Sequence, residues 1–190
     1  KDELIILDQL VHASIVDAAR LSGAKIRGFK HTDLTNLEDI LQATAKTKHR
    51  VLIVTESVFS MDGDQAPLKE LVALKEKYGA WLMVDEAHAT GLYGKNRRGL
   101  AEEIGVSEPI EIQMGTLGKA VGAAGGYICG SRSLIDFLIN RARSFIFSTA
   151  PVPAQSAAAC AGIKLIQSAQ GKTLQKTLWQ RVDLFNSKFK

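Results

Sequence analysis

A single lysine in a glycine-rich run is the residue around which the other reactive side chains of this chain can be ordered. Residues 114–126 read Met-Gly-Thr-Leu-Gly-Lys-Ala-Val-Gly-Ala-Ala-Gly-Gly and directly follow an apolar stretch. Glycines around Lys119 allow positive φ angles and a close approach of the backbone to a bound ligand. By itself, such a run indicates only a surface loop with one solvated lysine. Any chemistry must therefore come from partners elsewhere in the chain.

Two short patterns suggest nucleotide hydrolysis, but their spacing argues against it. Gly118 and Lys119 resemble the end of a phosphate loop, and residues 85–88, Asp-Glu-Ala-His, spell the acidic box of helicases. A phosphate loop needs a glycine five residues before Gly118 and a hydroxyl after the lysine, whereas this chain has Gln113 and Ala120. The loop should also precede the acidic box, and here it follows it. We therefore set ATP hydrolysis aside.

Composition describes an ordinary globular chain. Its 190 residues are 46% hydrophobic and 23% charged, which suffices for one domain with a sizeable core. The net charge is +4, but basic and acidic residues are interspersed, so we expect no nucleic-acid partner. No apolar run reaches the roughly 20 residues of a membrane span, so we expect no membrane contact and a cytoplasmic location. Cys129 and Cys160 lie among apolar or small residues and are expected to be reduced and buried.

Strand patterns alternate with helix patterns along the chain. Helical patterns are expected to begin at a cap residue Asn36 and at Pro67, and to be interrupted at Gly171. The alternation predicts an α/β fold with a mostly parallel sheet flanked by helices in three α/β/α layers. The expected strands are 4–7, 25–29, 50–56, 81–84, 110–114 and 127–129, and the expected helices include 12–21, 67–78, 131–143 and 153–168.

Several reactive residues follow strands of this predicted sheet. Ligands of such folds bind outside the carboxyl ends of the strands, and Ser60, Asp85, His88 and Lys119 all lie on segments that leave those ends. A lysine that forms a Schiff base, an aspartate for a pyridinium nitrogen and a stacking ring such as His12 are what pyridoxal phosphate requires. Taken singly, each has a simpler explanation, such as a helix cap, a metal ligand or a buried histidine.

Four stretches carry a specific resemblance. Residues 8–14, 55–64, 84–91 and 115–122 resemble the α-oxoamine synthase family. Members of that family are fold-type I pyridoxal-phosphate enzymes that condense an amino acid with an acyl-CoA and lose CO₂. Residues 143–150 and the Asp-Glu-Ala-His variant are closest to members that use L-alanine and pimeloyl-CoA. Members that use glycine or serine share the same catalytic residues, so they remain an alternative.

The resemblance implies roles for the residues that match the family motifs. Lys119 would form the Schiff base and then remove the α-proton of the amino acid. Asp85 would keep the pyridine nitrogen protonated. His12 would stack on the cofactor ring and face the substrate, and Ala87 would pack on the other side of the ring.

Further matches complete the implied site. His88 and Ser60 would hydrogen-bond the phenolic oxygen, and Thr116 would contact the phosphate. Glu56 would lie on the substrate side, and Thr149 would approach the cofactor of a partner subunit in a homodimer. The resemblance thus implies pyridoxal phosphate as cofactor, an amino acid and an acyl-CoA as substrates, and no metal.

The chain matches only part of the family pattern. It lacks a match to the amino-terminal third, with its glycine turn for the phosphate, and to the carboxyl-terminal domain, with its carboxylate-binding arginine. We therefore expect residues 1–170 to be a large domain that is incomplete at its amino end, with 171–190 a helix leading toward a further domain. A truncated, non-catalytic piece that binds cofactor weakly is the alternative from another class.

Overall fold

The fold is an α/β fold built on a mostly parallel sheet, as the sequence predicts. The computed structural model describes residues 3–45 and 50–189, and in this part of the chain the sheet has six strands in the order β2-β1-β3-β4-β5-β6. The first five strands run parallel, whereas β6 pairs antiparallel with β5. The strands are β1 (Glu3–Asp8), β2 (Lys25–Phe29), β3 (Arg50–Glu56), β4 (Trp81–Asp85), β5 (Ile112–Thr116) and β6 (Gly126–Gly130).

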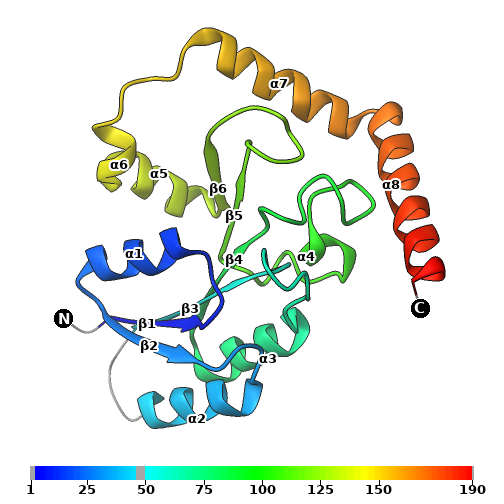
Figure 1. Ribbon diagram of the computed structural model, residues 1–190. Helices are drawn as coiled ribbons and strands as arrows, with labels where there is room; N and C mark the ends of the chain where they lie inside the picture. The colour runs from blue at the N-terminus through cyan, green and yellow to red at the C-terminus, as the bar shows by residue number, and fades with distance from the viewer. Residues whose placement is uncertain (1–2, 46–49, 190) are drawn as a thin grey trace.

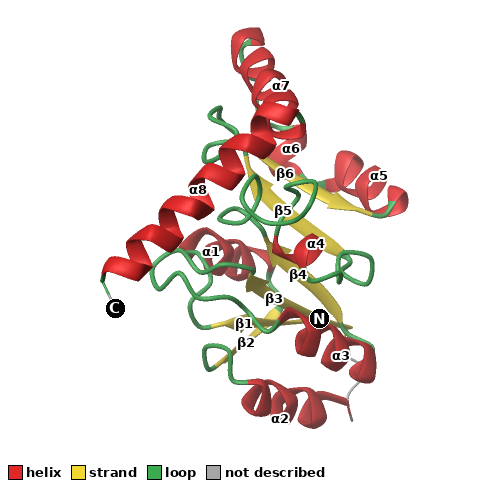
Figure 2. Ribbon diagram, turned by 90° about the vertical axis from the view of Figure 1, so that its right-hand side faces the viewer, coloured by secondary structure: helices red, strands yellow, loops and turns green. Residues whose placement is uncertain are grey.

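Helices cover both faces of the sheet, which confirms the three layers. Helices α1 and α5 lie on one face, and α2, α3 and α4 lie on the other (Figures 1 and 2). The long helices α7 and α8 extend along the side of the molecule that carries the carboxyl end (Figure 1). The helices are α1 (Ala13–Ser22), α2 (Leu34–Ala45), α3 (Leu68–Tyr78), α4 (Leu100–Glu103), α5 (Arg132–Arg141), α6 (Arg143–Ile146), α7 (Pro153–Gln167) and α8 (Ala169–Lys188).

The core has two parts because successive residues of a strand point to opposite faces. The larger cluster fills the space between the sheet and α2, α3 and α4, and includes Ile53 and Leu82. The smaller cluster lies under α1 and includes Leu7 and Val54. Strands that are buried on both faces need apolar residues at nearly every position. This explains the continuous apolar runs that made these strands recognisable.

Local signals predict some helix ends correctly and others incorrectly. Gly23 and Gly79 end α1 and α3 with φ angles of 72° and 63°, as their positions suggest. Asn36, however, does not cap α2. The helix begins at Leu34, and the carboxylate of Asp33 accepts the Asn36 backbone N–H at 2.9 Å. Asp33 therefore takes the capping role that we assigned to Asn36.

The long helical region near the carboxyl end breaks at Ser168 and not at Gly171. Ser168 Oγ accepts the backbone N–H of Gly171 at 3.1 Å and so caps α8. Gly171 is buried inside the first turn of α8, where a Cβ would collide with the carbonyl oxygens of Leu165 and Ile166. The glycine is thus needed for close packing between the two helices.

The helix expected over 131–143 is confirmed as α5, but it ends at Arg141 because Ala142 takes an extended conformation with ψ of 105°. One further expectation, the burial of the two cysteines, is wrong. Cys129 and Cys160 are free but exposed in this chain. Cys129 lies on β6, at the edge of the described sheet, and Cys160 faces outward from α7, so neither is covered by the core.

Candidate functional site

The candidate site lies at the carboxyl ends of the parallel strands, on the face of the sheet that α1 covers. Glu56 and Asp85 end β3 and β4 and are register partners in the parallel ladder. Each follows by two residues a side chain that packs toward α1, Val54 and Met83 respectively. The alternation of strand side chains therefore brings two carboxylates together on this face. They are 2% and 6% exposed.

Asp85 is a buried carboxylate surrounded by basic groups. Burial raises its pKa, whereas the backbone N–H of Ala87, which Asp85 Oδ1 accepts at 2.8 Å, opposes the shift. The charges of Lys119, His12 and His88 also lower the pKa of Asp85. Three further residues implied by the resemblance thus act through their charges on this carboxylate. A buried carboxylate in such surroundings can hold a protonated ring nitrogen.

Glu56 carries a buried oxygen that is not satisfied within the protein. Burial raises the pKa of Glu56, and the charge of Asp85 raises it further. The His12 backbone and the charges of His12 and Lys119 act in the opposite direction. Glu56 Oε1 has no hydrogen-bond partner among the described residues. Because buried polar atoms are nearly always paired, this oxygen marks a place where a polar group of a ligand is expected.

His12 is both a helix cap and a member of the site. Its Nδ1 accepts the backbone N–H of Ser14 at 3.2 Å and lies 2.7 Å from Ser14 Oγ. The ring precedes α1 and is exposed, so it remains accessible to a ligand. Since Nδ1 is an acceptor here, the neutral ring carries its proton on Nε2. The simple explanation of His12 as a cap and the implied catalytic role are therefore compatible.

Lys119 lies in a turn that the glycines make possible. Its carbonyl accepts the backbone N–H of Gly122 at 3.0 Å, and Leu117 N–H donates to the carbonyl of Gly125 at 2.8 Å. Gly122 and Gly125 have φ angles of 71° and 116°, which disfavour any residue with a Cβ. The side chain of Lys119 is exposed, and its charge reaches both carboxylates of the site.

His88 and Ala87 follow Asp85 at the end of β4. Burial lowers the pKa of His88, the positive charge of Lys119 lowers it further, and the charge of Asp85 acts against this. The half-buried ring is thus kept neutral near pH 7, so that one nitrogen can accept and the other donate a hydrogen bond. Ala87 is buried beside it and offers a small, flat contact surface.

Three of the expected residues form no hydrogen bond with this cluster within residues 3–45 and 50–189. Ser60 is exposed in the loop after β3. Thr116 Oγ1 donates to the carbonyl of Gly125 at 3.1 Å and accepts the Gly118 N–H at 3.1 Å, so its proton is used within the turn. Thr149 is exposed beyond α6. Their roles toward a ligand stay predictions.

Sequence reasoning missed one buried acid directly behind the site. Glu86 Oε1 accepts the backbone N–H of Ala101 at 2.8 Å, and Oε2 accepts Leu100 N–H at 3.0 Å and the hydroxyl of Ser57 at 2.6 Å. Burial raises the pKa of Glu86, and these hydrogen bonds oppose that shift. Glu86 thereby links the end of β4 to the start of α4. An acidic residue directly after a buried strand was the available signal.

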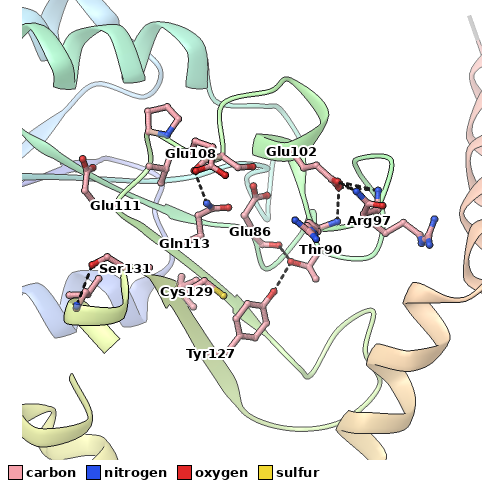
Figure 3. A pocket seen from close by; sticks show the side chains of 18 of the residues that line it. Glu86, Thr90, Arg97, Glu102, Glu108, Glu111, Gln113, Tyr127, Cys129 and Ser131 are labelled. Carbon is pink, nitrogen blue, oxygen red and sulfur yellow. Dashed lines mark hydrogen bonds between the residues drawn. The ribbon is translucent and has the colours of Figure 1, made fainter. Parts of the chain in front are cut away.

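A large cavity in the described part of the chain lies elsewhere. It measures about 1160 Å³ and opens along β4, β5 and β6 (Figure 3). Gln113 and Tyr127 line it and alternate with residues that face α1, so it lies on the opposite face from Asp85. Tyr127 Oη and Thr90 Oγ1 are 2.9 Å apart at its inner end (Figure 3). The cavity and the charged residues around Asp85 therefore lie on different surfaces of the sheet.

Comparison with known proteins agrees with this fold. The family model described as aminotransferase class I and II matches residues 1–190, and the chain belongs to that family.

Curated proteins similar to this chain include 8-amino-7-oxononanoate synthases. The chain is 52% identical over 178 residues to 8-amino-7-oxononanoate synthase of Geotalea daltonii, which covers 94% of this chain and 45% of the relative. It is 50% identical over 185 residues to the enzyme of that name from Geobacter sulfurreducens, with 97% and 47% covered. These relatives confirm the resemblance to the α-oxoamine synthases. The chain spans about half the length of the curated relatives it matches.

Solved structures place the chain in the same fold group. Serine palmitoyltransferase from S. paucimobilis, with a bound PLP-myriocin aldimine, matches with a TM-score of 0.89 and 36% identity, over 95% of this chain and 46% of that one. The 8-amino-7-oxononanoate synthase of Francisella tularensis matches with a TM-score of 0.82 and 34% identity, over 97% and 52%.

None of the helices in residues 3–45 and 50–189 is long and apolar enough to cross a membrane. Within the same residues, no group of three or more histidine, cysteine, aspartate or glutamate side chains is arranged to hold a metal ion.

Proposed function

We propose that this chain is part of a pyridoxal-phosphate enzyme that condenses L-alanine with pimeloyl-CoA. The products would be 8-amino-7-oxononanoate, CoA and CO₂, as in biotin biosynthesis. The observation that carries the proposal is the buried carboxylate of Asp85, whose pKa the charges of Lys119, His12 and His88 act to lower. The names of the relatives at about 50% identity support the choice of reaction.

The residues at the carboxyl ends of the strands fit this cofactor. A buried carboxylate suits a protonated ring nitrogen, and a neutral histidine suits a phenolic oxygen. Asp85 and His88 provide these two groups, while His12 and Ala87 offer the flat surfaces for the two sides of a ring. Lys119 supplies the amine. When bound, pyridoxal phosphate provides an electron sink that stabilises negative charge on the substrate α-carbon.

Other side chains of this chain would transfer the proton and bind the substrate. Lys119 Nζ would take the proton from the substrate α-carbon and return it to the product. His12 Nε2 remains free, because Nδ1 is engaged by Ser14, and would hydrogen-bond the substrate carboxylate. Glu56, whose pKa is raised by burial and by Asp85, would present its unpartnered oxygen to the substrate.

An absorption spectrum tests whether the cofactor binds. The complete natural polypeptide that contains this sequence should develop a band near the edge of the visible range when pyridoxal phosphate is added. Lys119→Ala should lose that band, because it removes the amine that bonds to the cofactor. No band at saturating pyridoxal phosphate would favour the alternative of a non-catalytic piece.

Exchange of the alanine α-proton in D₂O tests the role of Asp85. Asp85→Asn should still bind the cofactor but lose nearly all exchange, since an amide cannot keep the ring nitrogen protonated. Exchange at the parent rate would contradict this assignment. Rates with alanine, glycine and serine against several acyl-CoAs would then separate the alanine reaction from that of glycine-using or serine-using members.

The assembly and the domain division are also proposals. We infer a homodimer in which Thr149 approaches the cofactor of the partner subunit, located in the cytoplasm. Residues 1–170 would belong to the large domain and 171–190 would lead toward a further domain. Sedimentation velocity on the complete polypeptide, with and without cofactor, tests the dimer, and a monomer with full cofactor binding would contradict it.

A further inference from the structure

A second cluster of charged residues also lies at the carboxyl ends of the strands, but on the face of the sheet opposite Asp85. His31 Nδ1 lies 2.9 Å from Asp8 Oδ1, and His31 Nε2 lies 2.8 Å from Asp64 Oδ2. The three residues come from the end of β1, the turn after β2 and the loop after β3. They are separated in sequence by 23 and 33 residues. We call this group the Asp8–His31–Asp64 clamp.

Asp8 is the fixed end of the clamp. Its side chain is 1% exposed, and its two oxygens accept the backbone N–H groups of Leu10 and Thr32, each at 2.9 Å. A carboxylate oxygen can accept more than one hydrogen bond, so Asp8 Oδ1 can also accept one from His31 Nδ1. Thr32 has a φ of 54°, which is rare for a β-branched residue, and its N–H bond to Asp8 helps to hold this conformation.

Asp64 connects the clamp to the loop after β3. Its carbonyl accepts Phe59 N–H at 3.0 Å, and the Phe59 carbonyl accepts Gly63 N–H at 3.0 Å, which closes the turn that carries Ser60. The rings of His31 and Phe59 meet edge to face, with centroids 4.4 Å apart. His31 therefore contacts this turn at both of its ends.

Both ring nitrogens of His31 face carboxylates, so both must carry a proton for the two hydrogen bonds to form. This is the imidazolium form. Burial alone would lower the pKa of His31, but the hydrogen bonds and charges of Asp8 and then Asp64 raise it above the ordinary value of 6.5. Asp8 on β1 and Asp64 in the loop after β3 are the charged groups that face the ring from the described elements.

We propose that His31 is a positioning residue, which as an imidazolium holds the turn leading to His12 at a set distance from the turn that carries Ser60. The first turn is tied to the clamp because Leu10 N–H donates to the side chain of Asp8 and Val11 N–H donates to its carbonyl. The two turns contribute a ring-stacking group and a hydroxyl to the cofactor site. This part of the inference rests on the proposed function.

The clamp should respond to pH. A histidine whose folded-state pKa is raised stabilises the fold fully below the unfolded value and loses that contribution as pH rises through the folded value. The clamp is therefore complete below about pH 6.5. It loosens as pH rises through the raised pKa of His31, and cofactor affinity should fall over the same interval.

Two substitutions and a matched control test the clamp in the complete natural polypeptide. His31→Gln removes the positive charge, and Asp64→Asn keeps the size and an acceptor oxygen but removes the negative charge. Asp62→Asn is the control, because Asp62 is an exposed acid in the same turn. We measure the dissociation constant for pyridoxal phosphate, the NMR titration of His31, and amide hydrogen exchange without cofactor.

His31→Gln should weaken cofactor binding about tenfold, which corresponds to about 1.4 kcal/mol. It should also speed amide exchange in residues 10–12 and 59–64 and leave exchange in α3 and α7 unchanged. The fall in affinity with pH should be absent from His31→Gln. Asp64→Asn should lower the pKa of His31 and weaken binding in the same direction, while Asp62→Asn should match the parent in every measurement.

Three results would overturn the proposal. The first is parent affinity and parent exchange in His31→Gln. The second is faster exchange throughout the sheet, which would indicate general stabilisation and not positioning. The third is an unchanged His31 titration in Asp64→Asn, a variant that decides the matter if His31→Gln does not fold. If the parent itself binds no pyridoxal phosphate, the proposed function fails, and the exchange and titration results still judge the clamp separately.

Discussion

Removal of the Glu86 carboxylate should destabilise the protein, because three buried donors bond to it. Leu100 N–H and the Ser57 hydroxyl bond to one oxygen, and Ala101 N–H bonds to the other. The three donor residues are 2%, 0% and 0% exposed. Glu86→Ala leaves the two backbone N–H groups without their acceptor, whereas the Ser57 hydroxyl still has the carbonyl of Asp85 at 3.2 Å.

The size of the effect follows from these contacts. Leaving one buried donor unsatisfied costs roughly 1–3 kcal/mol, so the two backbone donors set a gross cost of roughly 2–6 kcal/mol. Glu86→Ala also removes the unfavourable burial of a charge, which offsets part of that cost. We expect a net loss of about 3 kcal/mol in the free energy of unfolding. Glu86→Gln keeps one acceptor oxygen and should lose about half as much.

Urea denaturation of the complete natural polypeptide, followed by circular dichroism at pH 7, measures both variants against the parent. Glu102→Ala serves as a control for the loss of a nearby acid whose hydrogen bonds are with exposed groups. A loss below about 0.5 kcal/mol in Glu86→Ala, comparable to an ordinary surface substitution, would refute the reasoning. It would mean that other groups satisfy these donors when the carboxylate is removed.

Three further predictions concern the elements around the site. Glu56→Gln should gain stability relative to the parent as pH rises, because the raised folded-state pKa of Glu56 makes its ionisation unfavourable above the ordinary value of 4.5; unfolding measured from pH 4 to 7 checks this. Gly122→Ala should cost about 1 kcal/mol from its φ of 71° alone, since no atom lies within 4 Å of the added methyl; a neutral effect in urea denaturation would contradict it. Trp179→Phe should cost about 1 kcal/mol through loss of the 3.0 Å hydrogen bond to the Leu92 carbonyl, and equal stability would show that bond to be unimportant.

The order of the elements could be predicted because its signals are local. Apolar runs such as 50–56 and terminal glycines such as Gly23 and Gly79 act through neighbouring residues, and the structure bears them out. Where two neighbouring residues could both cap a helix, residue type alone did not show which of them forms the cap. Asp33, and not Asn36, caps α2.

Predictions that depended on distant neighbours were less successful. Gly171 was interpreted as a helix breaker, but it lies within α8 because the end of α7 comes too close for a side chain. Cys129 was expected to be buried from its apolar neighbours in sequence. Those neighbours do not reveal that β6 lies at the edge of the described sheet.

The sequence by itself determined the types of the reactive residues, their places after successive strands, and the family to which they belong. These depend on short patterns, such as residues 84–91 and 115–122, that survive in the sequence without knowledge of the fold. It also predicted Lys119 and Asp85 as central residues, and in the structure the charge of Lys119 acts to lower the pKa of Asp85.

Only the tertiary structure decided which residues support the site from behind. The strand order β2-β1-β3 brings the ends of three strands side by side, and only then does His31 reach both Asp8 and Asp64. The same sheet sets Glu56 beside Asp85. The reason is physical: these contacts join residues far apart in the chain, so no local pattern encodes them, and burial changes their charges only after the sheet has formed.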